Sequence, residues 1–358
     1  MVEQESNTSQ RSEIMIAHGE SIVLCTHMIH IQQGLPGRDV PIEPNTYSPE
    51  AVASYLQELD RRVNTRTIVG LTVHSFDWNT LIQMQEKLDG LKLNKVQIIY
   101  CVEAYSIRNE EDNNIWSIRD HLGQHIVLVM PGKPSEIFQL LNNYGLNAVE
   151  NPTDPNYRAM TRFRYIKELR RLGFYSICAH PTDRLFPFLD SYLIRELEEL
   201  KASEVIDAIE LNIDRIMWFM GTKHDGDEYI RNINIVASKL GLPLLVGTDA
   251  HGPWHLLERN GGSQDTLQSD EWNPRLAPFV GFNIVQNNSD KPLSLIDVLR
   301  DPIASIVPNF SIPRDASERS IFGLFKLERW EQGGISWLVI KALLMAYLDE
   351  MIYRKYNA

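Results

Sequence analysis

The feature that most constrains the fold of this sequence is a series of short apolar runs, rich in β-branched residues, that alternate with longer segments of helical periodicity. The runs cover residues 21–26, 67–73, 96–102, 126–130, 174–179, 205–211 and 243–248. Repeated strand and helix units predict a parallel sheet that is buried on both faces, and about seven of them are enough to curl into a barrel. We therefore expect an α/β fold of the (β/α)-barrel type and not an open sheet.

The strand and helix alternation stops near residue 260, where residues 260–264 are typical of a loop. We therefore divide the 358 residues into a lead-in at 1–19, a barrel at 20–260 and a mostly helical C-terminal extension at 261–358. The last helix, expected over about 335–353, is apolar nearly all round. It must be buried against the barrel, a second subunit or a membrane surface, and we expect either a clamp on the barrel or a homodimer.

Composition narrows the choice of partners and compartment. A net charge of −12 opposes binding to a polyanion, so nucleic acid is not an expected partner. Three widely spaced cysteines form no secreted disulfide framework, and the N-terminus lacks the basic start and apolar run of a signal peptide. The longest apolar stretch, residues 335–348, contains Lys341 and is shorter than the about 20 residues of a membrane span. These features predict a cytoplasmic protein with no membrane span.

Histidines and acidic residues collect at the carboxyl ends of the predicted strands. Strands one, two, three, five and seven are followed by His27, His74, Glu103, His180, and Asp249 with His251, while His125 stands at the head of strand four. In a (β/α)-barrel the carboxyl ends converge on the face where active sites are built. Imidazole and carboxylate are ligands of zinc, manganese and iron, and a carboxylate can bridge two ions. The sequence therefore predicts a multinuclear metal site.

At these residues the chain resembles the PHP family of metal-dependent phosphoesterases, named for polymerase and histidinol phosphatase. The matching segments are Cys25-Thr26-His27, Leu71-Thr72-Val73-His74, Val102-Glu103, His125-Ile126-Val127-Leu128, Ala179-His180-Pro181, Ile209-Glu210-Leu211-Asn212 and Gly247-Thr248-Asp249-Ala250-His251. They span roughly residues 20–252, and the Ala-His-Pro and Gly-Thr-Asp-Ala-His segments are the most specific. The resemblance implies a distorted barrel of seven strands, two or three divalent ions (zinc, manganese or iron), and hydrolysis of a phosphate ester by a metal-bound hydroxide.

The resemblance also implies roles for individual residues. The candidate metal ligands are His27, His74, Glu103, His125, His180, Asp249 and His251, and Cys25 is added to them as one of the two alternatives for that residue given below. Glu103 is the candidate bridge between ions, Asp249 also orients the attacking water, and His251 protonates the leaving oxygen, so these three are the expected catalytic residues. Arg184, which follows the Ala-His-Pro segment, is a candidate clamp for the substrate phosphate.

Two positions depart from the family pattern. Cys25 stands where the family has the first histidine of a His-x-His pair, and Val73 stands where it has an aspartate before the second-strand histidine. Cys25 is either a thiolate ligand, which favours zinc or iron over manganese, or a small residue of the barrel wall beside a lost or weakly held ion. The expected substrate is a small phosphorylated molecule. Two alternatives stay open: a non-catalytic or regulatory barrel, and a metal-dependent hydrolase of a non-phosphate bond.

Residues beside the predicted ligands carry two further expectations. Cys25, Cys101 and Cys178 each precede a predicted ligand by two positions, so all three thiols are expected to point inward, one layer below the ligands. Glu210 and Asn212, near the end of strand six, suit either hydrogen bonding to a ligand histidine or substrate, or a purely structural role.

Overall fold

The computed structural model describes residues 12–31, 49–73, 76–107, 125–146, 160–181, 191–212, 226–248 and 281–310. The helix expected over 335–353 lies outside these residues. In the part of the chain that is described, none of the helices combines the length and the apolar character needed to cross a bilayer.

The described elements alternate between strands and helices over most of the chain. The strands are β1 (Met15–Ile16), β2 (Ser21–His30), β3 (Thr67–Val73), β4 (Val96–Ile107), β5 (His125–Val129), β6 (Met160–Arg162), β7 (Tyr175–Cys178), β8 (Ala208–Asn212), β9 (Leu244–Gly247), β10 (Gly281–Gln286), β11 (Leu293–Ser294) and β12 (Ser305–Phe310). The helices are α1 (Pro49–Arg62), α2 (Trp78–Asp89), α3 (Pro134–Asn143), α4 (Phe163–Arg171), α5 (Ser191–Ala202), α7 (Gly226–Leu240) and α10 (Leu295–Arg300).

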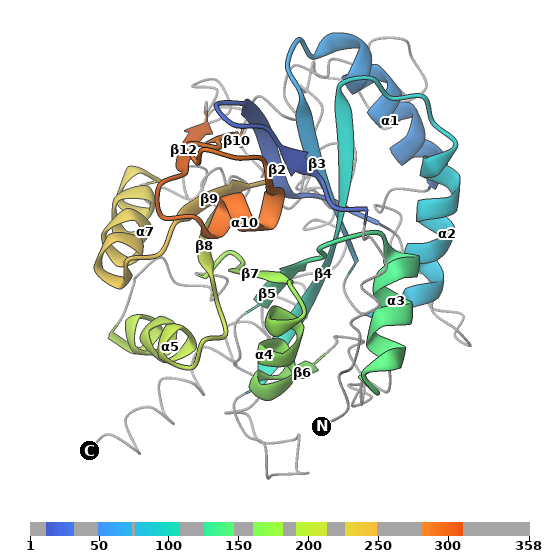
Figure 1. Cartoon of the computed structure of the whole chain (residues 1–358). Helices are drawn as coiled ribbons and strands as arrows, with labels where there is room; N and C mark the ends of the chain where they lie inside the picture. Colours follow the sequence, from blue (N-terminus) through green and yellow to red (C-terminus); the bar gives the residue numbers. More distant parts are fainter. Residues whose placement is uncertain are drawn as a thin grey trace, which may run out of the picture.

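Ten of the strands form one strongly curved sheet. Its order is β12-β10-β2-β3-β4-β5-β7-β8-β9, and β6 pairs with β4 beside this path. The helices lie around the strands, with α1, α2 and α3 along one flank and α5 and α7 on another (Figure 1). All seven runs that predict strands are strands in the structure, and they lie side by side in chain order as a barrel requires.

The gap between β2 and β9 is almost closed by hydrogen bonds. The amide of Thr248, just after β9, donates to the carbonyl of His27 on β2 at 2.9 Å. Asn283 of β10 accepts from the amide of Val246 at 2.8 Å and donates to the carbonyls of Val246 and Leu24 at 3.0 and 3.1 Å. This fully buried side chain therefore ties β9 to β2 and makes the sheet a nearly closed barrel.

Two features of the sheet differ from the sequence-based expectation. β5 is antiparallel to both β4 and β7, so the sheet is not the fully parallel one expected of a regular (β/α) barrel. The described part of the C-terminal extension, residues 281–310, is not mostly helical, because β10 and β12 pair antiparallel and β10 pairs with β2. In the sequence, the apolar runs of β10 and β12 are short and follow loop-like residues, so they do not by themselves predict strands. The division of the chain at residues 20 and 260 stays a prediction.

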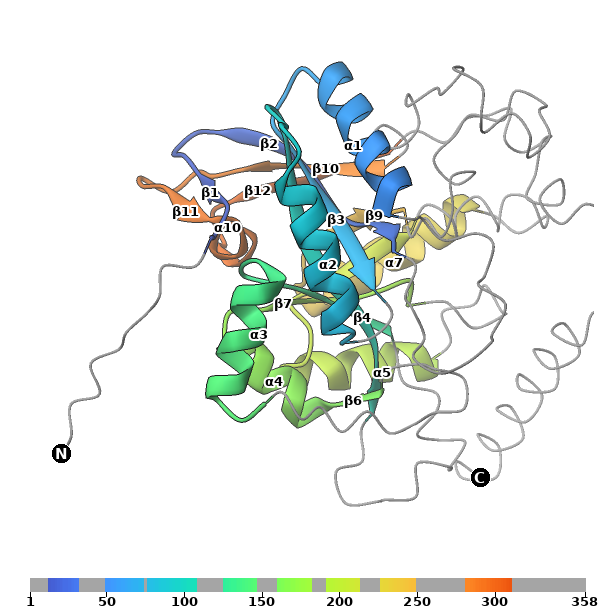
Figure 2. The ribbon, with the colours of Figure 1, turned by 90° about the vertical axis from the view of Figure 1, so that its right-hand side faces the viewer.

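Buried apolar side chains form two clusters on opposite sides of the barrel wall. The inner cluster fills the barrel and includes Leu24, Cys101 and Val127, together with side chains of α10. The outer cluster packs the strands against helices α1 to α5 and α7, and it includes Leu56, Val102 and Ile209 among many others. Figure 2 shows α10 with β1 and β11 at one end of the barrel.

Candidate metal centre

Strands from around the barrel bring three histidines and a glutamate to one place. β2 carries His27, β4 carries Glu103, β5 begins at His125, and His180 follows β7. His125 is at the head of its strand, yet it pairs with Tyr105 near the end of β4 because β5 runs in the opposite direction. The antiparallel strand therefore places the one exceptional histidine at the same end of the barrel as the others.

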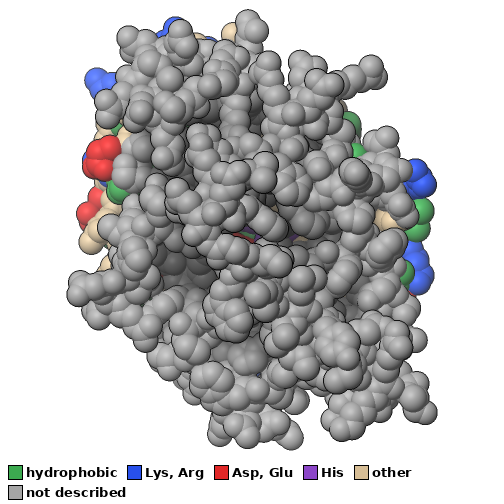
Figure 3. Space-filling view, turned by 180° about the vertical axis from the view of Figure 1, so that it is seen from behind, with side chains coloured by type: hydrophobic (Ala, Val, Ile, Leu, Met, Phe, Trp, Pro, Cys, Tyr) green, Lys and Arg blue, Asp and Glu red, His purple; other side chains and the backbone are tan. Residues whose placement is uncertain are grey.

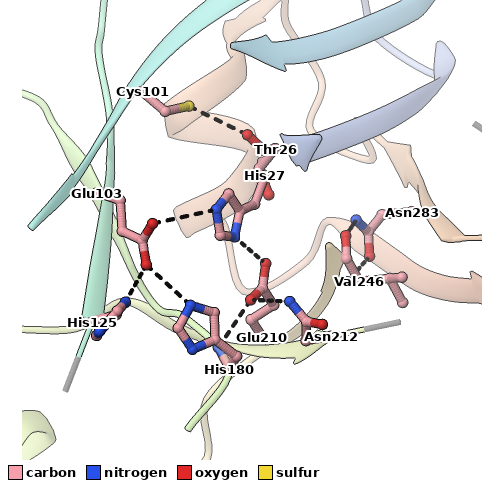
Figure 4. Close-up of polar contacts among 10 residues, drawn as sticks. All are labelled: Thr26, His27, Cys101, Glu103, His125, His180, Glu210, Asn212, Val246 and Asn283. Atoms are coloured by element: carbon pink, nitrogen blue, oxygen red, sulfur yellow. Dashed lines mark hydrogen bonds and ion pairs between the residues drawn. The ribbon is translucent and has the colours of Figure 1, made fainter. Parts of the chain in front are cut away.

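The carboxylate of Glu103 lies at the middle of this group (Figure 4). Its Oε1 atom contacts Nδ1 of His125 and lies 3.0 Å from Nε2 of His180, while its Oε2 atom lies 4.0 Å from Nε2 of His27. The imidazole rings are close to one another as well, with centroids 4.6 Å apart for His125 and His180 and 6.1 Å apart for His27 and His180. One carboxylate thus faces two histidines with one oxygen and a third with the other.

The group is almost completely removed from solvent. His27, Glu103 and His180 are at most 3% exposed, while the side chain of His125 is 15% exposed. In the view from behind the molecule, small areas of acidic and histidine side chains are visible near the centre (Figure 3). Buried ionisable groups are costly unless they are paired or coordinate a metal, so this concentration points to an ion-binding function.

The donor atoms fit a divalent transition-metal ion. One donor atom each from Glu103, His125 and His180 lie within 4.8 Å of one another. Zinc binds nitrogen and oxygen ligands at about 2.0–2.2 Å, so two donors that share one ion lie at most about 4.4 Å apart. The three donor atoms of this site need only small side-chain adjustments to meet that limit. Two imidazole nitrogens and a carboxylate oxygen suit zinc, manganese or iron.

Glu210 supports the group from β8. Its Oε1 atom accepts a hydrogen bond from Nδ1 of His27 at 2.8 Å, and Asn212 donates to its Oε2 atom at 3.3 Å. A carboxylate oxygen accepts a proton contact and cannot donate one, so the proton of the His27 ring lies on Nδ1. Nε2 of His27 faces Glu103, and in the neutral ring it carries the lone pair that can bind a metal. The structure therefore shows Glu210 hydrogen-bonded to His27, a histidine that the sequence predicts to be a metal ligand.

Two of the three cysteines do not lie below the ligands. Cys101 is in the inner cluster on the face of β4 that carries Glu103, but Cys25 and Cys178 are in the outer cluster. The register of β2 shifts between Cys25 and Ile29, and His180 has a φ of +29°, so the two-residue alternation is broken before each histidine. The expectation of three inward thiols is wrong for Cys25 and Cys178 for this reason.

Cys25 is not one of the three residues, Glu103, His125 and His180, whose donor atoms lie within 4.8 Å of one another. Burial, together with the charge of Glu210, raises the pKa of its thiol to about 12, although hydrogen bonding to Thr248 acts in the opposite direction. Its role as a metal ligand stays a prediction. His74, Arg184, Asp249 and His251 lie outside the described residues, and their roles stay predictions as well.

The sequence analysis assigned no role to two residues of this region, Gly247 and Asn283. A glycine inside a strand signals a close approach of other atoms, which was a usable signal for Gly247. Asn283 lies beyond the part of the chain where the sequence suggested a barrel, so nothing local in the sequence marked it.

Comparisons with known proteins give only distant similarities. No protein-family profile matches the chain. The comparison with curated proteins gives no match either. Among solved structures, PsfC from Pseudomonas syringae PB-5123 is 14% identical with a TM-score of 0.44, and the match covers 88% of this chain and 100% of PsfC.

Two further solved structures are of proteins whose assignment as metal-dependent phosphoesterases is itself a prediction. A protein from Bifidobacterium adolescentis is 11% identical with a TM-score of 0.34, covering 64% of this chain and 87% of that one. A two-domain protein from Bacteroides vulgatus with a PHP-like phosphoesterase part is 14% identical with a TM-score of 0.38, covering 88% and 74%. At this level of similarity, the function must be argued from the side chains of the site.

Proposed function

We propose that this protein is a metal-dependent hydrolase that cleaves a phosphate ester, with a small phosphomonoester as its substrate and two or three divalent ions as its cofactor. The observation that carries the proposal is the buried Glu103 carboxylate, which faces His125 and His180 with one oxygen and His27 with the other. A carboxylate placed in this way can serve two neighbouring ions.

Each described side chain has a distinct part in this proposal. When bound, divalent ions polarise phosphate oxygens and lower the pKa of water toward neutrality. His125 and His180 offer nitrogen ligands beside one oxygen of Glu103, and His27 offers Nε2 beside the other. The near-complete burial of Glu103 excludes bulk water and strengthens its interaction with a cation.

The remaining roles come from the sequence and belong to the same proposal. His74 would complete the ligand set, and Asp249 would ligate and orient the attacking water, while Cys25, which packs in the outer cluster, would be a small residue of the barrel wall. His251 would protonate the leaving oxygen, and Arg184 would clamp the phosphate. A small substrate is favoured over a polymer because the net charge of −12 gives no general attraction for a nucleic-acid backbone.

A cytoplasmic location is part of the proposal as well. It rests on the three buried cysteines, none of which is joined to another in a disulfide.

The test combines metal analysis with a substrate screen. Full-length protein reconstituted with zinc, manganese or iron is expected to hold at least two ions per chain and to release phosphate from a panel of phosphomonoesters. Glu103→Gln and His125→Ala should each remove most of the activity and at least one ion. Glu20→Gln and His18→Ala are matched controls, because Glu20 pairs with Arg66 and His18 contacts the carbonyl of Ser289, away from the site.

Three outcomes would contradict the proposal in different ways. Less than one ion per chain after reconstitution would remove the metal centre. Full metal content without turnover of any phosphate ester, but with cleavage of carboxylic esters or amides, would assign another hydrolase class. Full metal content without any turnover would favour a regulatory barrel.

A further inference from the structure

Glu210 contacts two of the candidate metal ligands at the same time. Its Oε1 atom accepts from the ring of His27 at 2.8 Å, and its Oε2 atom accepts from the backbone amide of His180 at 2.9 Å. The side chain is 1% exposed, and Asn212 donates to Oε2 as a third contact at 3.3 Å. Figure 4 shows this carboxylate between the two histidines, on the side away from Glu103.

Both oxygens of Glu210 are therefore occupied by N–H donors of the protein. A carboxylate in this position acts on a metal centre through the histidines and not as a ligand. Carboxylates that accept the second ring N–H of a ligand histidine fix its tautomer and orientation and make it a stronger donor. For His27, the fixed tautomer leaves Nε2 as the nitrogen that faces Glu103.

The contact between Glu210 and His180 involves the backbone of the histidine and not its ring. His180 has a φ of +29°, a conformation that L-residues rarely adopt and that must be held by surrounding contacts. This turn of the backbone breaks the strand alternation after β7, and the ring of His180 lies beside Glu103 as a result. The hydrogen bond from its amide to Glu210 holds the backbone at this position.

Gly247 of β9 provides the space that Glu210 occupies. A Cβ atom at residue 247 would lie 1.8 Å from Oε1 of Glu210, 2.7 Å from its Cδ atom and 3.1 Å from Cβ of His27. The φ of Gly247 is not in the left-handed region, so its backbone conformation does not require glycine. The need for glycine at this position comes from the carboxylate.

We propose that Glu210 is the positioning residue of the metal centre, which fixes the tautomer of His27 and the backbone of His180 together, and that Gly247 is the residue that admits it. The inference rests on the proposed function, because it concerns the same ions. It goes further in assigning two residues that touch neither ion nor substrate.

The first measurement is metal affinity of the full-length protein. The dissociation constant for zinc is measured by competition with a chelator of known affinity. Glu210→Ala is expected to weaken zinc binding by about 10- to 100-fold, as for other residues that support metal ligands. Gly247→Ala should weaken it to a similar extent, although it alters no ligand and no charge. Controls are Glu198→Gln, which changes an exposed ion pair with Lys239, and Gly90→Ala, whose added Cβ meets only the Lys87 carbonyl at 3.6 Å.

The second measurement needs no metal. Two-dimensional 1H–15N spectra of the metal-free protein distinguish the two neutral histidine tautomers, and the His27 signals are assigned with a His27→Gln variant. Wild type should show the proton of His27 on Nδ1. Glu210→Gln keeps an oxygen that can accept from this proton and should retain the tautomer, whereas Glu210→Ala should lose it. Circular dichroism confirms that each variant is folded.

A double-mutant cycle separates the role of Gly247 from a general effect of crowding. In the Glu210→Ala background, the added methyl of Gly247→Ala no longer meets a carboxylate, so it should cause little further loss of zinc affinity. Additive losses would overturn the role given to Gly247. Unchanged zinc affinity in folded Glu210→Ala would overturn the positioning role alone. A wild-type protein that binds no ion would overturn the proposed function, and with it any role of Glu210 toward a metal.

Discussion

Asp207, at the amino end of β8, joins three elements through a single carboxylate. Arg170 of α4 donates to it at 2.5 and 3.2 Å, Arg300 of α10 donates at 3.2 Å, and the amide and hydroxyl of Ser176 donate at 2.9 and 3.1 Å. Burial raises the pKa of Asp207, but the hydrogen bonds and charges of the two arginines, with the amide of Ser176, outweigh it and hold the pKa below the ordinary value of 3.8. The ionised form therefore stabilises the fold.

Asp207→Asn should lower the free energy of unfolding at pH 7 by about 1.5–3 kcal/mol, the range for hydrogen bonds to a charged group. Because the pKa is lower in the folded protein than in the unfolded chain, this stabilisation is present above pH 3.8 and is lost as the pH falls further. Urea unfolding of wild type and variant at several pH values between 7 and 3 should therefore give curves that converge at the acidic end.

The control for this experiment is Glu198→Gln, which removes an exposed ion pair with Lys239 and should cost less than about 1 kcal/mol. A difference between wild type and Asp207→Asn that stays constant down to pH 3 would show that the charge of Asp207 is not what stabilises the fold.

At the scale of elements, β10 completes a barrel that the seven consecutive strands leave open. The seam between β2 and β9 depends on Asn283, which satisfies three backbone groups of Val246 and Leu24. His27 and Gly247 follow these residues closely along the two strands. We therefore expect the closure of the barrel and the geometry of the metal centre to be coupled.

Asn283→Leu should destabilise the protein by at least about 1–3 kcal/mol, because buried backbone donors and acceptors lose their partner. It should also weaken zinc binding, since β2 and β9 carry His27 and Gly247 beside the seam. Urea unfolding and chelator competition measure the two effects.

Asn288→Ala is the matched control, because Asn288 donates to the carbonyl of Ile303 from an exposed position. Loss of stability in Asn283→Leu with unchanged zinc affinity would show that the seam and the metal centre are independent.

At the scale of the whole molecule, the longest apolar stretch of the sequence lies outside the described residues. The segment over 335–352 includes Trp337, Leu338, Ile340, Leu344, Met345, Leu348 and Ile352. Full burial of such a side chain contributes roughly 1.5–3 kcal/mol, so we expect the segment to pack on the barrel or on a second copy of the chain.

A chain that ends at Gly334 should aggregate or unfold at a lower temperature than the full chain. If the segment joins two copies, light scattering should show a dimer for the full chain and a monomer for any soluble truncate. A chain that ends at Tyr353 keeps the segment and is the control. A monodisperse truncate with the mass per particle, melting temperature and activity of the full chain would show that the segment is dispensable.

Much of the barrel could be predicted from the sequence because each strand has a local pattern of apolar residues. Seven apolar runs gave seven strands in the right order, since each run reports burial on both faces of a sheet. On β4, where the pairing is regular, the two-residue alternation also placed Cys101 and Glu103 on the inner face. It failed before His27 and His180, where a register shift and a positive φ depend on neighbouring strands.

The sequence by itself determined which residue types stand at the strand ends, and so that His27, Glu103, His125 and His180 were candidates for one metal centre. The tertiary structure alone decided the direction of β5, the closure of the seam by Asn283, and the contact between His27 and Glu210 across 183 residues. The physical reason is the separation along the chain of the residues that interact. Apolar periodicity records whether a residue is buried, but the partner that satisfies a buried polar group is chosen by packing between segments far apart in the chain.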